Sequence, residues 1–333
     1  MKVFEIRDPG TPEALRPSTR EEPVPGPGQV VMELRAASLN YRDLLILRGH
    51  YPNLRLPVIP LSDGAGTVVA TGPGVSRVRT GDRVAGIFNQ NWIDGPPPRQ
   101  AMALGGDRDG VLAERVLLPA EGLVRIPESL SFEEASTLPC AAVTAWNALF
   151  VQGRLRPGET VLVQGTGGVS MFALQFAKMA GARAIVTSSS DRKLDKASLL
   201  GADTGINYRT CPEWDQEVLA RTDGVGVDHV VEVGGAGTLG RSLSCTRPGG
   251  HVAVIGVLSG GQAELAVFPL LAKQLRMQGV YVGSRRHFEE MLDAIVQNNL
   301  RPVIDRVIPF ASAPEAFQAL ADEEFTGKIC LKF

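Results

Sequence analysis

Three glycines in the segment VLVQGTGGVS, residues 161–170, indicate a place where the backbone must approach another molecule closely. An apolar run ends at Gly165, and Gly167 and Gly168 follow it. Glycine strengthens neither a buried strand nor a helix, so its use here favours a tight turn. Such a turn before a helix offers free N–H groups and the positive end of the helix dipole to a diphosphate. A packing turn that holds no ligand is the alternative interpretation.

The next strand end indicates which dinucleotide such a turn would bind. Proteins that prefer NAD usually carry an acid about 20 residues further on, where it binds the ribose hydroxyls. An acid would repel a 2′-phosphate, whereas hydroxyls can donate to it and a cationic side chain can neutralise it. This chain has hydroxyl and basic residues there, namely Thr187, Ser188, Ser189, Ser190, Arg192 and Lys193. The pattern favours NADPH over NADH; the alternatives are that Asp191 caps a helix and that Arg192 and Lys193 form a solvated helical turn.

The elements that would position these residues alternate between strand and helix. Apolar residues from Val169 to Ala180 recur at three-four spacing, which predicts a helix after the strand at 160–165. Further strands are predicted within AIVTSSS, GVDHVVEVGG and GHVAVIGVLSGG. This rhythm predicts right-handed crossovers and an α/β fold with a doubly wound parallel sheet, the Rossmann arrangement, over residues 142–282.

The chain before residue 142 has a different character. QVVMELRAAS, residues 29–38, alternates so that Val30, Met32 and Leu34 share one face, and turn-rich strand segments follow it. Residues 1–141 are therefore predicted to form a mainly β domain, to which the tail at 283–333 returns. Residues 89–110 read as a long loop, either functional or a simple surface excursion.

Bulk properties exclude several classes of partner. A net charge of −2 gives no basic surface for nucleic acid. The sequence shows neither a signal peptide nor an apolar run long enough to span a bilayer, so we expect a cytoplasmic protein with no membrane partner. The cysteines, Cys140, Cys211, Cys245 and Cys330, are widely separated, which favours reduced thiols over disulfides or a zinc knuckle.

Five motifs, LNYRD, GHYP, PLSDGAG, GTGGVS and INYR, together resemble the medium-chain dehydrogenase/reductase superfamily. The resemblance covers essentially the whole chain and is strongest to the zinc-independent quinone oxidoreductase and enoyl reductase branches and to zinc-type alcohol dehydrogenase-like proteins. It implies a GroES-like catalytic domain and a Rossmann domain that binds a nicotinamide dinucleotide. It also implies a homodimer that pairs Rossmann sheets edge to edge through a segment such as VAVIGVLSG. Small residues at the last motif position, here Ser170, still permit close helix–strand packing.

The chain departs from zinc-dependent members of that superfamily at the metal ligands. They carry a cysteine where this chain has Asn40, and a His-Glu pair where it has Ser62 and Asp63. Only Cys140 matches a ligand position, and one thiolate with an amide and a hydroxyl cannot form a tetrahedral zinc site. Residues 89–110 also lack the cysteines of a structural zinc lobe. We therefore expect no metal.

The resemblance further implies the site residues. Asn40 would donate to a developing oxyanion or hold the nicotinamide ribose, and Tyr51 would orient or protonate the acceptor. As alternatives, Asn40 ends a strand and Tyr51 packs a turn before Pro52. Leu45 replaces a tyrosine common in quinone reductases, which weakens the quinone assignment. The expected cofactor contacts are Thr144, Gly165, Thr166, Gly167, Gly168, Val169, Ser188, Ser189, Lys193, Tyr208, Gly234, Ile255 and Val257.

The sequence thus predicts an NADP(H)-dependent, metal-free oxidoreductase that transfers a hydride to a quinone or to the C=C bond of an α,β-unsaturated carbonyl such as an enone or enal. Two alternatives stay open. One is an alcohol dehydrogenase-like enzyme that acts on an alcohol/aldehyde pair without zinc. The other is a non-catalytic, crystallin-like protein that keeps the NADPH site.

Overall fold

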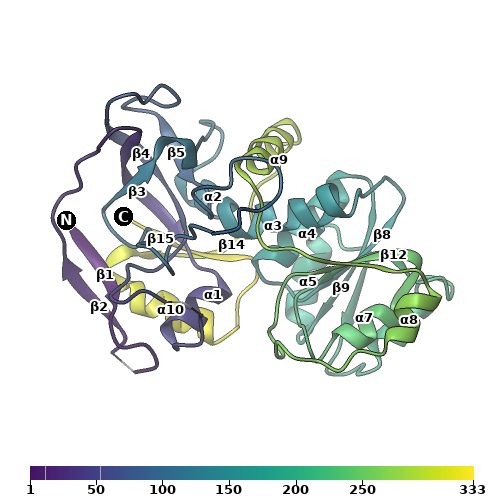
Figure 1. Ribbon diagram of the computed structural model, residues 1–333. Coiled ribbons are helices and arrows are strands. Elements are labelled where there is room, and N and C mark those ends of the chain that lie inside the picture. The colour runs from purple at the N-terminus through teal and green to yellow at the C-terminus, as the bar shows by residue number, and fades with distance from the viewer. Residues whose placement is uncertain (12, 53) are drawn as a thin grey trace. The chain divides into compact units, whose positions relative to one another are not determined.

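The computed structural model describes residues 1–11, 13–52 and 54–333, and the chain divides into two compact units (Figure 1). Unit 1 comprises Met1–Val143 and Val282–Phe333, and unit 2 comprises Thr144–Tyr281. The sequence predicts boundaries after residues 141 and 282, whereas the structure places them after Val143 and Tyr281. The first boundary falls inside a continuous run of helical turns, where composition offers no break.

Unit 1 is built on a seven-stranded sheet with the order β14-β15-β3-β4-β5-β7, and β6 also pairs with β3. A separate hairpin joins β1 to β2. The strands are β1 Lys2–Ile6, β2 Leu15–Thr19, β3 Gln29–Ser38, β4 Asp63–Thr71, β5 Arg83–Gly86, β6 Arg115–Pro119, β7 Leu123–Arg125, β14 Ile304–Pro309 and β15 Lys328–Lys332. The helices are α1 Tyr41–Leu47, α2 Phe132–Ser136, α9 Arg285–Gln297 and α10 Ala313–Ala321, with short turns η1 Ala120–Gly122, η2 Leu138–Ala142 and η4 Phe310–Ser312.

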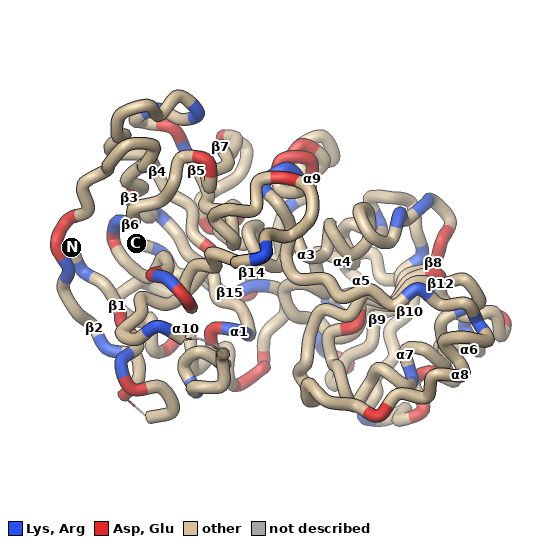
Figure 2. The backbone as a smooth tube through the Cα atoms, viewed as in Figure 1, with Lys and Arg blue, Asp and Glu red and all other residues tan. Residues whose placement is uncertain are grey.

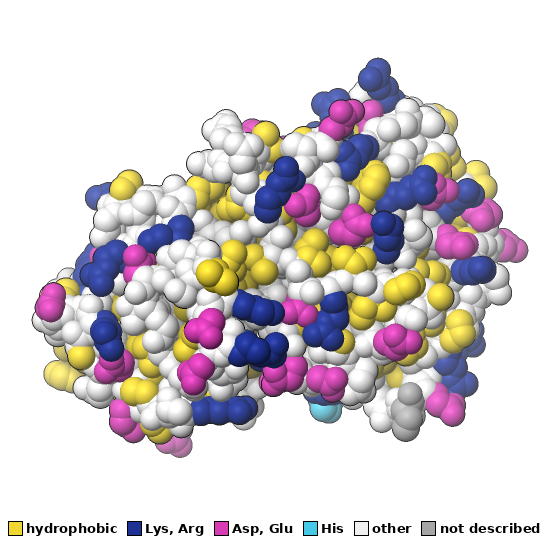
Figure 3. Space-filling view, turned by 180° about the vertical axis from the view of Figure 1, so that it is seen from behind, with side chains coloured by type: hydrophobic (Ala, Val, Ile, Leu, Met, Phe, Trp, Pro, Cys, Tyr) yellow, Lys and Arg dark blue, Asp and Glu magenta, His cyan; other side chains and the backbone are white. Residues whose placement is uncertain are grey.

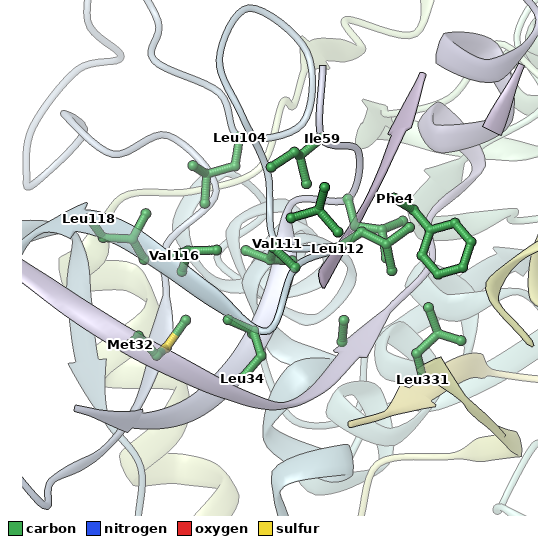
Figure 4. Close-up of a cluster of buried hydrophobic side chains, with 14 of the residues drawn as sticks. Phe4, Met32, Leu34, Ile59, Leu104, Val111, Leu112, Val116, Leu118 and Leu331 are labelled. Carbon is green, nitrogen blue, oxygen red and sulfur yellow. The ribbon is translucent and has the colours of Figure 1, made fainter. Parts of the chain in front are cut away.

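The core of unit 1 lies against one face of β3. Val30, Met32 and Leu34 are buried there, as the alternation of β3 predicts, and they pack with apolar residues of the long loops and of β15 (Figure 4). Towards its end, β3 is buried on both faces, because Ala36, Ala37 and Ser38 are all inaccessible. The chain therefore leaves β3 inside the unit and delivers the next residues to a buried environment.

The C-terminal strand completes this region. β15 runs antiparallel to β3 with Cys330 opposite Ser38, and the Leu39 N–H donates to the Ile329 carbonyl. Continuing this register by two residues sets Lys328 opposite Asn40. The tail thus brings a basic side chain to the end of β3 from the far end of the sequence.

Unit 2 contains a six-stranded sheet whose strands are all parallel, in the order β10-β9-β8-β11-β12-β13. This confirms the predicted doubly wound Rossmann arrangement. The strands are β8 Thr160–Gln164, β9 Arg183–Ser188, β10 Thr204–Asn207, β11 Val227–Glu232, β12 Thr246–Val254 and β13 Arg276–Gly279. The helices are α3 Val143–Trp146, which begins in unit 1, and α4 Gly168–Met179, α5 Asp191–Leu199, α6 Trp214–Ala220, α7 Leu239–Cys245 and α8 Val267–Ala272; η3 is Asn147–Gln152.

One expectation about this sheet is wrong. VAVIGVLSG, residues 252–260, was expected to supply a free edge, but β12 pairs with β11 on one side and with β13 on the other. The edge strand on this side of the sheet is β13, whose four residues RMQG are all exposed. β13 is not predictable from the sequence, because RMQG lacks the apolar run of a buried strand.

Charged residues are distributed over both units, with Lys and Arg interspersed among Asp and Glu along the backbone (Figure 2). The face drawn in the space-filling view likewise mixes both signs with apolar atoms (Figure 3). No helix in the described part of the chain is long and apolar enough to cross a membrane.

Candidate active site and cofactor-binding turn

The glycine turn of unit 2 lies between β8 and α4. Gly165 has φ +70°, a backbone conformation that favours glycine. The buried Ser170 hydroxyl donates to the Gln164 carbonyl at 2.6 Å, which ties the first turn of α4 to the end of β8. This hydrogen bond gives Ser170 a structural role, so the last position of the motif is explained without a ligand.

Gly167 fits a ligand better than it fits internal packing. A Cβ atom at this position would meet no heavy atom of the described residues within 4 Å, so the protein itself leaves the space beside it open. Gly167 precedes α4 and provides no side-chain cap for its N–H groups. The first turn of a helix has N–H groups without partners inside the helix, and a diphosphate can accept from them. Thr166 is buried and Val169 half-buried beside this opening.

The ends of β9 and β10 bring Ser188 and Tyr208, two of the residues expected to contact a 2′-phosphate, to one edge of the sheet. Ser188 ends β9, and its carbonyl accepts from the N–H of Tyr208, which follows β10. Lys193 lies in the first turn of α5 and is buried, so it is not the solvated residue of the alternative interpretation. Asp191 is held by the Asn207 side-chain amide at 2.8 Å. Asp191, the acid in the first turn of α5, therefore has a partner within the fold. Ser189, next to Ser188 in the chain, is half-buried.

A buried polar network that was not among the predicted features fixes the ends of β8 and β11. Glu232 is inaccessible, and its carboxylate accepts from the N–H groups of Gly234 and Gly235 and from the Gln164 side chain, at 2.8–2.9 Å. A Cβ at Gly234 would lie 2.2 Å from the Thr238 hydroxyl, so internal packing alone requires this glycine. An acid inside the apolar run VVEVGG was the signal that could have revealed the network.

For Ile255, Val257 and Thr144, also expected to contact the cofactor, the structure gives the position and burial but no contact that points to a ligand. Ile255 follows β12 and its N–H donates to the Glu232 carbonyl, which places it at the same edge of the sheet. Val257 is half exposed. Thr144 is buried in α3, at the start of unit 2. Their contacts with a cofactor stay predictions.

Unit 1 contains a buried polar cluster around Asn40 and Asp63, two of the positions at which the resemblance implies metal ligands in zinc-dependent relatives. Asn40 follows β3, Asp63 begins β4 and Lys328 begins β15. The Lys328 ammonium donates to the Asn40 side-chain carbonyl oxygen, Oδ1, and to the Leu39 carbonyl, both at 2.5 Å, and lies 3.8 Å from an Asp63 oxygen. Lys328 and Asp63 are fully buried, so the cluster holds an ion pair within the fold.

The cluster does not fit a zinc ion. Asn40 Oδ1 accepts from an ammonium, and the Ser62 hydroxyl donates to Asp63 at 2.6 Å. Burial and the neighbouring Asp63 raise the pKa of the Cys140 thiol, so the thiolate that zinc requires is disfavoured. Among the described residues, no group of three or more His, Cys, Asp or Glu side chains is placed to hold a metal. We therefore assign no catalytic step to a metal in this cluster.

Asp43 and Arg42 follow Asn40 closely in the sequence and contribute charged groups near it. Asp43 accepts from the Asn40 N–H at 2.7 Å, and burial raises the pKa of Asp43 to about 6 although the Arg42 guanidinium 3.8 Å away opposes the rise. Arg42 also lies over the rings of Tyr51 and Phe88, each 4.7 Å from its centroid. Tyr51 is half-buried and packs against this guanidinium, and its catalytic role stays a prediction.

Comparison with known proteins establishes the family. Residues 26–128 match the family model of the alcohol dehydrogenase GroES-like domain, and residues 168–297 match that of the zinc-binding dehydrogenases. A zinc-type alcohol dehydrogenase-like protein of Schizosaccharomyces pombe is 46% identical over 328 residues, which cover 96% of this chain and 95% of the relative. The chain belongs to the medium-chain dehydrogenase/reductase superfamily. As a member of this superfamily it is an oxidoreductase.

Solved structures agree with the two-part fold of this medium-chain dehydrogenase/reductase. A putative alcohol dehydrogenase from Sinorhizobium meliloti superposes with a TM-score of 0.93 at 44% identity, covering 100% of this chain and 99% of that one. An NAD-dependent alcohol dehydrogenase superposes with a TM-score of 0.92 at 35% identity, with complete coverage of both chains.

Other similar proteins are described by a different activity or by a bound cofactor. A quinone oxidoreductase from Pseudomonas syringae is 29% identical with a TM-score of 0.86, covering 100% of this chain and 99% of that one. A mycobacterial protein complexed with NADPH is 28% identical with a TM-score of 0.84 and full coverage of both chains. An acryloyl-coenzyme A reductase from Metallosphaera sedula is 30% identical over 93% of this chain and 94% of its own.

Proposed function

We propose that this protein is an NADPH-dependent, metal-free oxidoreductase that transfers a hydride to a quinone or to the C=C bond of an α,β-unsaturated carbonyl. The observation that carries the proposal is the cluster around Asn40, where an amide and a buried ammonium stand in place of a metal-ligand set. The amide nitrogen of Asn40, Nδ2, is buried and has no hydrogen-bond partner among the described residues. Such a donor suits an oxygen on which charge develops.

The chemistry divides between the cofactor and the side chains of unit 1. The reduced nicotinamide supplies the hydride when it is bound. Asn40 donates from Nδ2 to the carbonyl oxygen of the acceptor and stabilises the enolate or hydroquinone anion that hydride addition produces. Tyr51 orients the acceptor or gives its phenolic proton to the product anion. The quinone oxidoreductase and the acryloyl-coenzyme A reductase among the relatives support both acceptor classes.

The choice of NADPH rests on the end of β9. Ser188 and the buried Lys193 provide a hydroxyl and a cation for a 2′-phosphate, and Asp191 is engaged by Asn207. The mycobacterial neighbour binds NADPH, whereas another neighbour is NAD-dependent, so relatives support either cofactor. The side chains of this chain favour NADPH.

A turnover screen tests the proposal. Purified protein is mixed with NADPH or NADH and with quinones, enones and enals, and cofactor oxidation is followed by absorbance. Alcohols with NADP⁺ or NAD⁺ form a second arm, which reports alcohol dehydrogenase activity. Steady NADPH oxidation with an activated alkene or quinone supports the proposal, and binding of NADPH without turnover of any acceptor would instead favour the crystallin-like alternative.

Elemental analysis of the same preparation tests the metal-free assignment. We expect zinc well below one equivalent and activity that survives a chelator, because Asn40, Ser62 and Cys140 form no ligand set. A full equivalent of zinc that is lost together with activity would restore the alcohol dehydrogenase interpretation.

We also propose a homodimer formed at the β13 edge of unit 2. β13 has no neighbour on its outer side among the strands of the described sheet, and apolar side chains are exposed in the preceding helix α8, namely Val267, Phe268 and Leu271. An unpaired edge strand is a template for pairing with a second copy. Light scattering of wild type and Phe268→Asp tests this: we expect a dimer that dissociates in the variant, and a monomeric wild type contradicts the proposal.

A further inference from the structure

The orientation of the Asn40 side chain is set from behind by Lys328. An ammonium group carries only hydrogen-bond donors, so the atom of the amide that faces it must be the carbonyl oxygen. Lys328 Nζ lies 2.5 Å from Asn40 Oδ1. The opposite orientation would set an NH₂ group against an ammonium, two donors in contact with no acceptor between them. The Asn40 amide therefore has one permitted orientation, with Nδ2 directed away from Lys328.

The backbone around this pair is held by contacts other than the hydrogen bond between Lys328 and the Asn40 side chain. Asp43 accepts from the Asn40 N–H, and the neighbouring Leu39 carbonyl accepts from Lys328 at 2.5 Å. The register of β15 on β3 sets Lys328 opposite Asn40, 288 residues away in the sequence. The ammonium and the amide are thus held against each other by a sheet, which leaves little freedom for either to move.

We propose that Lys328 is a positioning residue for the reaction: its ammonium holds the Asn40 amide so that Nδ2 faces the oxygen of the reacting carbonyl. This inference rests on the proposed function, because it takes Asn40 as the oxyanion donor. Lys328 also withdraws electron density from the amide oxygen, which strengthens the donor character of Nδ2 at the other end of the group. In this proposal the buried Lys328 cation acts on the substrate only through the Asn40 amide.

A double-mutant cycle on kcat separates this role from a merely structural one. Asn40→Ala should lower kcat about 10²-fold, as removal of an oxyanion donor does. Lys328→Met should lower kcat roughly tenfold, the equivalent of one lost hydrogen bond, and Lys328→Arg should restore most of it. If Lys328 acts only through Asn40, the double variant should be no slower than Asn40→Ala alone. A double variant whose loss of kcat equals the product of the two single losses would overturn the inference. An unchanged kcat in Lys328→Met would also overturn it.

Two further variants keep the cycle interpretable. Lys332→Met lies on the same strand with an exposed side chain and should leave kcat unchanged. If Lys328→Met does not fold, because Asp63 is then buried without its cation, the cycle is repeated in an Asp63→Asn background, which removes both charges together.

A spectroscopic readout distinguishes failure of this inference from failure of the proposed function. The side-chain NH₂ resonances of Asn40 are identified in ¹⁵N–¹H spectra by their absence in Asn40→Ala. They should move or broaden in Lys328→Met and stay in place in Lys332→Met. Absence of turnover in the wild type refutes the proposed function, whereas unchanged Asn40 resonances in Lys328→Met refute the positioning role whatever the activity.

Discussion

His251 should make unit 2 lose stability in mild acid. The side chain lies on β12, is 2% exposed and has its Nε2 atom buried without a hydrogen-bond partner among the described residues. Its Nδ1 atom lies 3.5 Å from Nδ1 of His229. Burial, together with the neighbouring His229 and Arg276, lowers the pKa of His251 to about 4, because a positive charge there would be poorly solvated and repelled. The folded protein therefore keeps this imidazole neutral where the unfolded chain would protonate it.

The sign and size of the effect follow from linkage. The unfolded chain binds the proton with a pKa of about 6.5, so below that pH it binds more protons than the folded state and stability is lost. His251 therefore costs the folded state little stability above about pH 6.5, and the cost grows as the pH falls towards 4. With these two pKa values the loss is about 2 kcal/mol at pH 5 and about 3 kcal/mol at pH 4.

Urea unfolding of wild type and His251→Phe between pH 7 and pH 5 measures this loss. Phenylalanine fills similar space without a titrating group, so the free energy of unfolding of the variant should fall by about 2 kcal/mol less over this range. Trp146 and Trp214 both lie in unit 2 and report its unfolding by fluorescence. His50, exposed in unit 1, provides the control His50→Ala, which should follow the wild type. Parallel pH profiles for His251→Phe and wild type would refute the reasoning.

Three other predictions concern single side chains. Because burial raises the pKa of Asp43 to about 6, the folded state holds its proton to higher pH than the unfolded chain does; stability should therefore fall by about 2 kcal/mol as the pH rises from 4 to 6, and Asp43→Asn should remove that fall in urea titrations. Lys193→Ala should weaken NADPH binding by roughly 1–3 kcal/mol and leave NADH binding unchanged in calorimetry, whereas equal losses for both cofactors would exclude a 2′-phosphate contact. Tyr51→Phe should lower kcat about 10²-fold if the hydroxyl is the proton donor, more for an enone than for a quinone, and an unchanged kcat for both would leave Tyr51 as a wall of the site.

Local patterns explain why the unit 2 fold could be predicted. Buried strands rich in valine, helices with three-four spacing and glycines at one strand end are all signals within a few residues of sequence, and the parallel sheet follows from their order. Ser170 is similar, because its partner Gln164 is six residues away. The burial of Lys193 could not be predicted, because it depends on the packing of α5, which the neighbouring residues in the sequence do not reveal.

The candidate site of unit 1 shows what local patterns cannot supply. Asn40 could be named from its motif, but its partner Lys328 lies in a strand at the other end of the chain, and only the register of β15 on β3 brings them together. Nothing in the segment GKICLKF marks Lys328 as buried, since a lysine in a terminal strand is usually exposed. Asp43 raises the same difficulty, because its altered pKa arises from burial by distant elements.

The strength of the Asn40 donor bears on which substrate class the protein can reduce. Hydride addition to a quinone leaves an oxygen anion like that of a phenol, whose pKa is about 10, whereas addition to an aldehyde leaves an alkoxide, comparable to hydroxide with a pKa near 15.7. The difference, about 6 pKa units, corresponds to about 8 kcal/mol of stabilisation that an aldehyde site must add. A single oxyanion donor contributes about 2.7–4 kcal/mol, which suffices for a phenol-like anion but falls short for an alkoxide unless a proton arrives with the hydride. We therefore expect kcat/KM for a quinone or enone to exceed that for a saturated aldehyde of similar size by at least about 10²-fold, and comparable values would show that some stronger electrophile than Asn40 acts in the site.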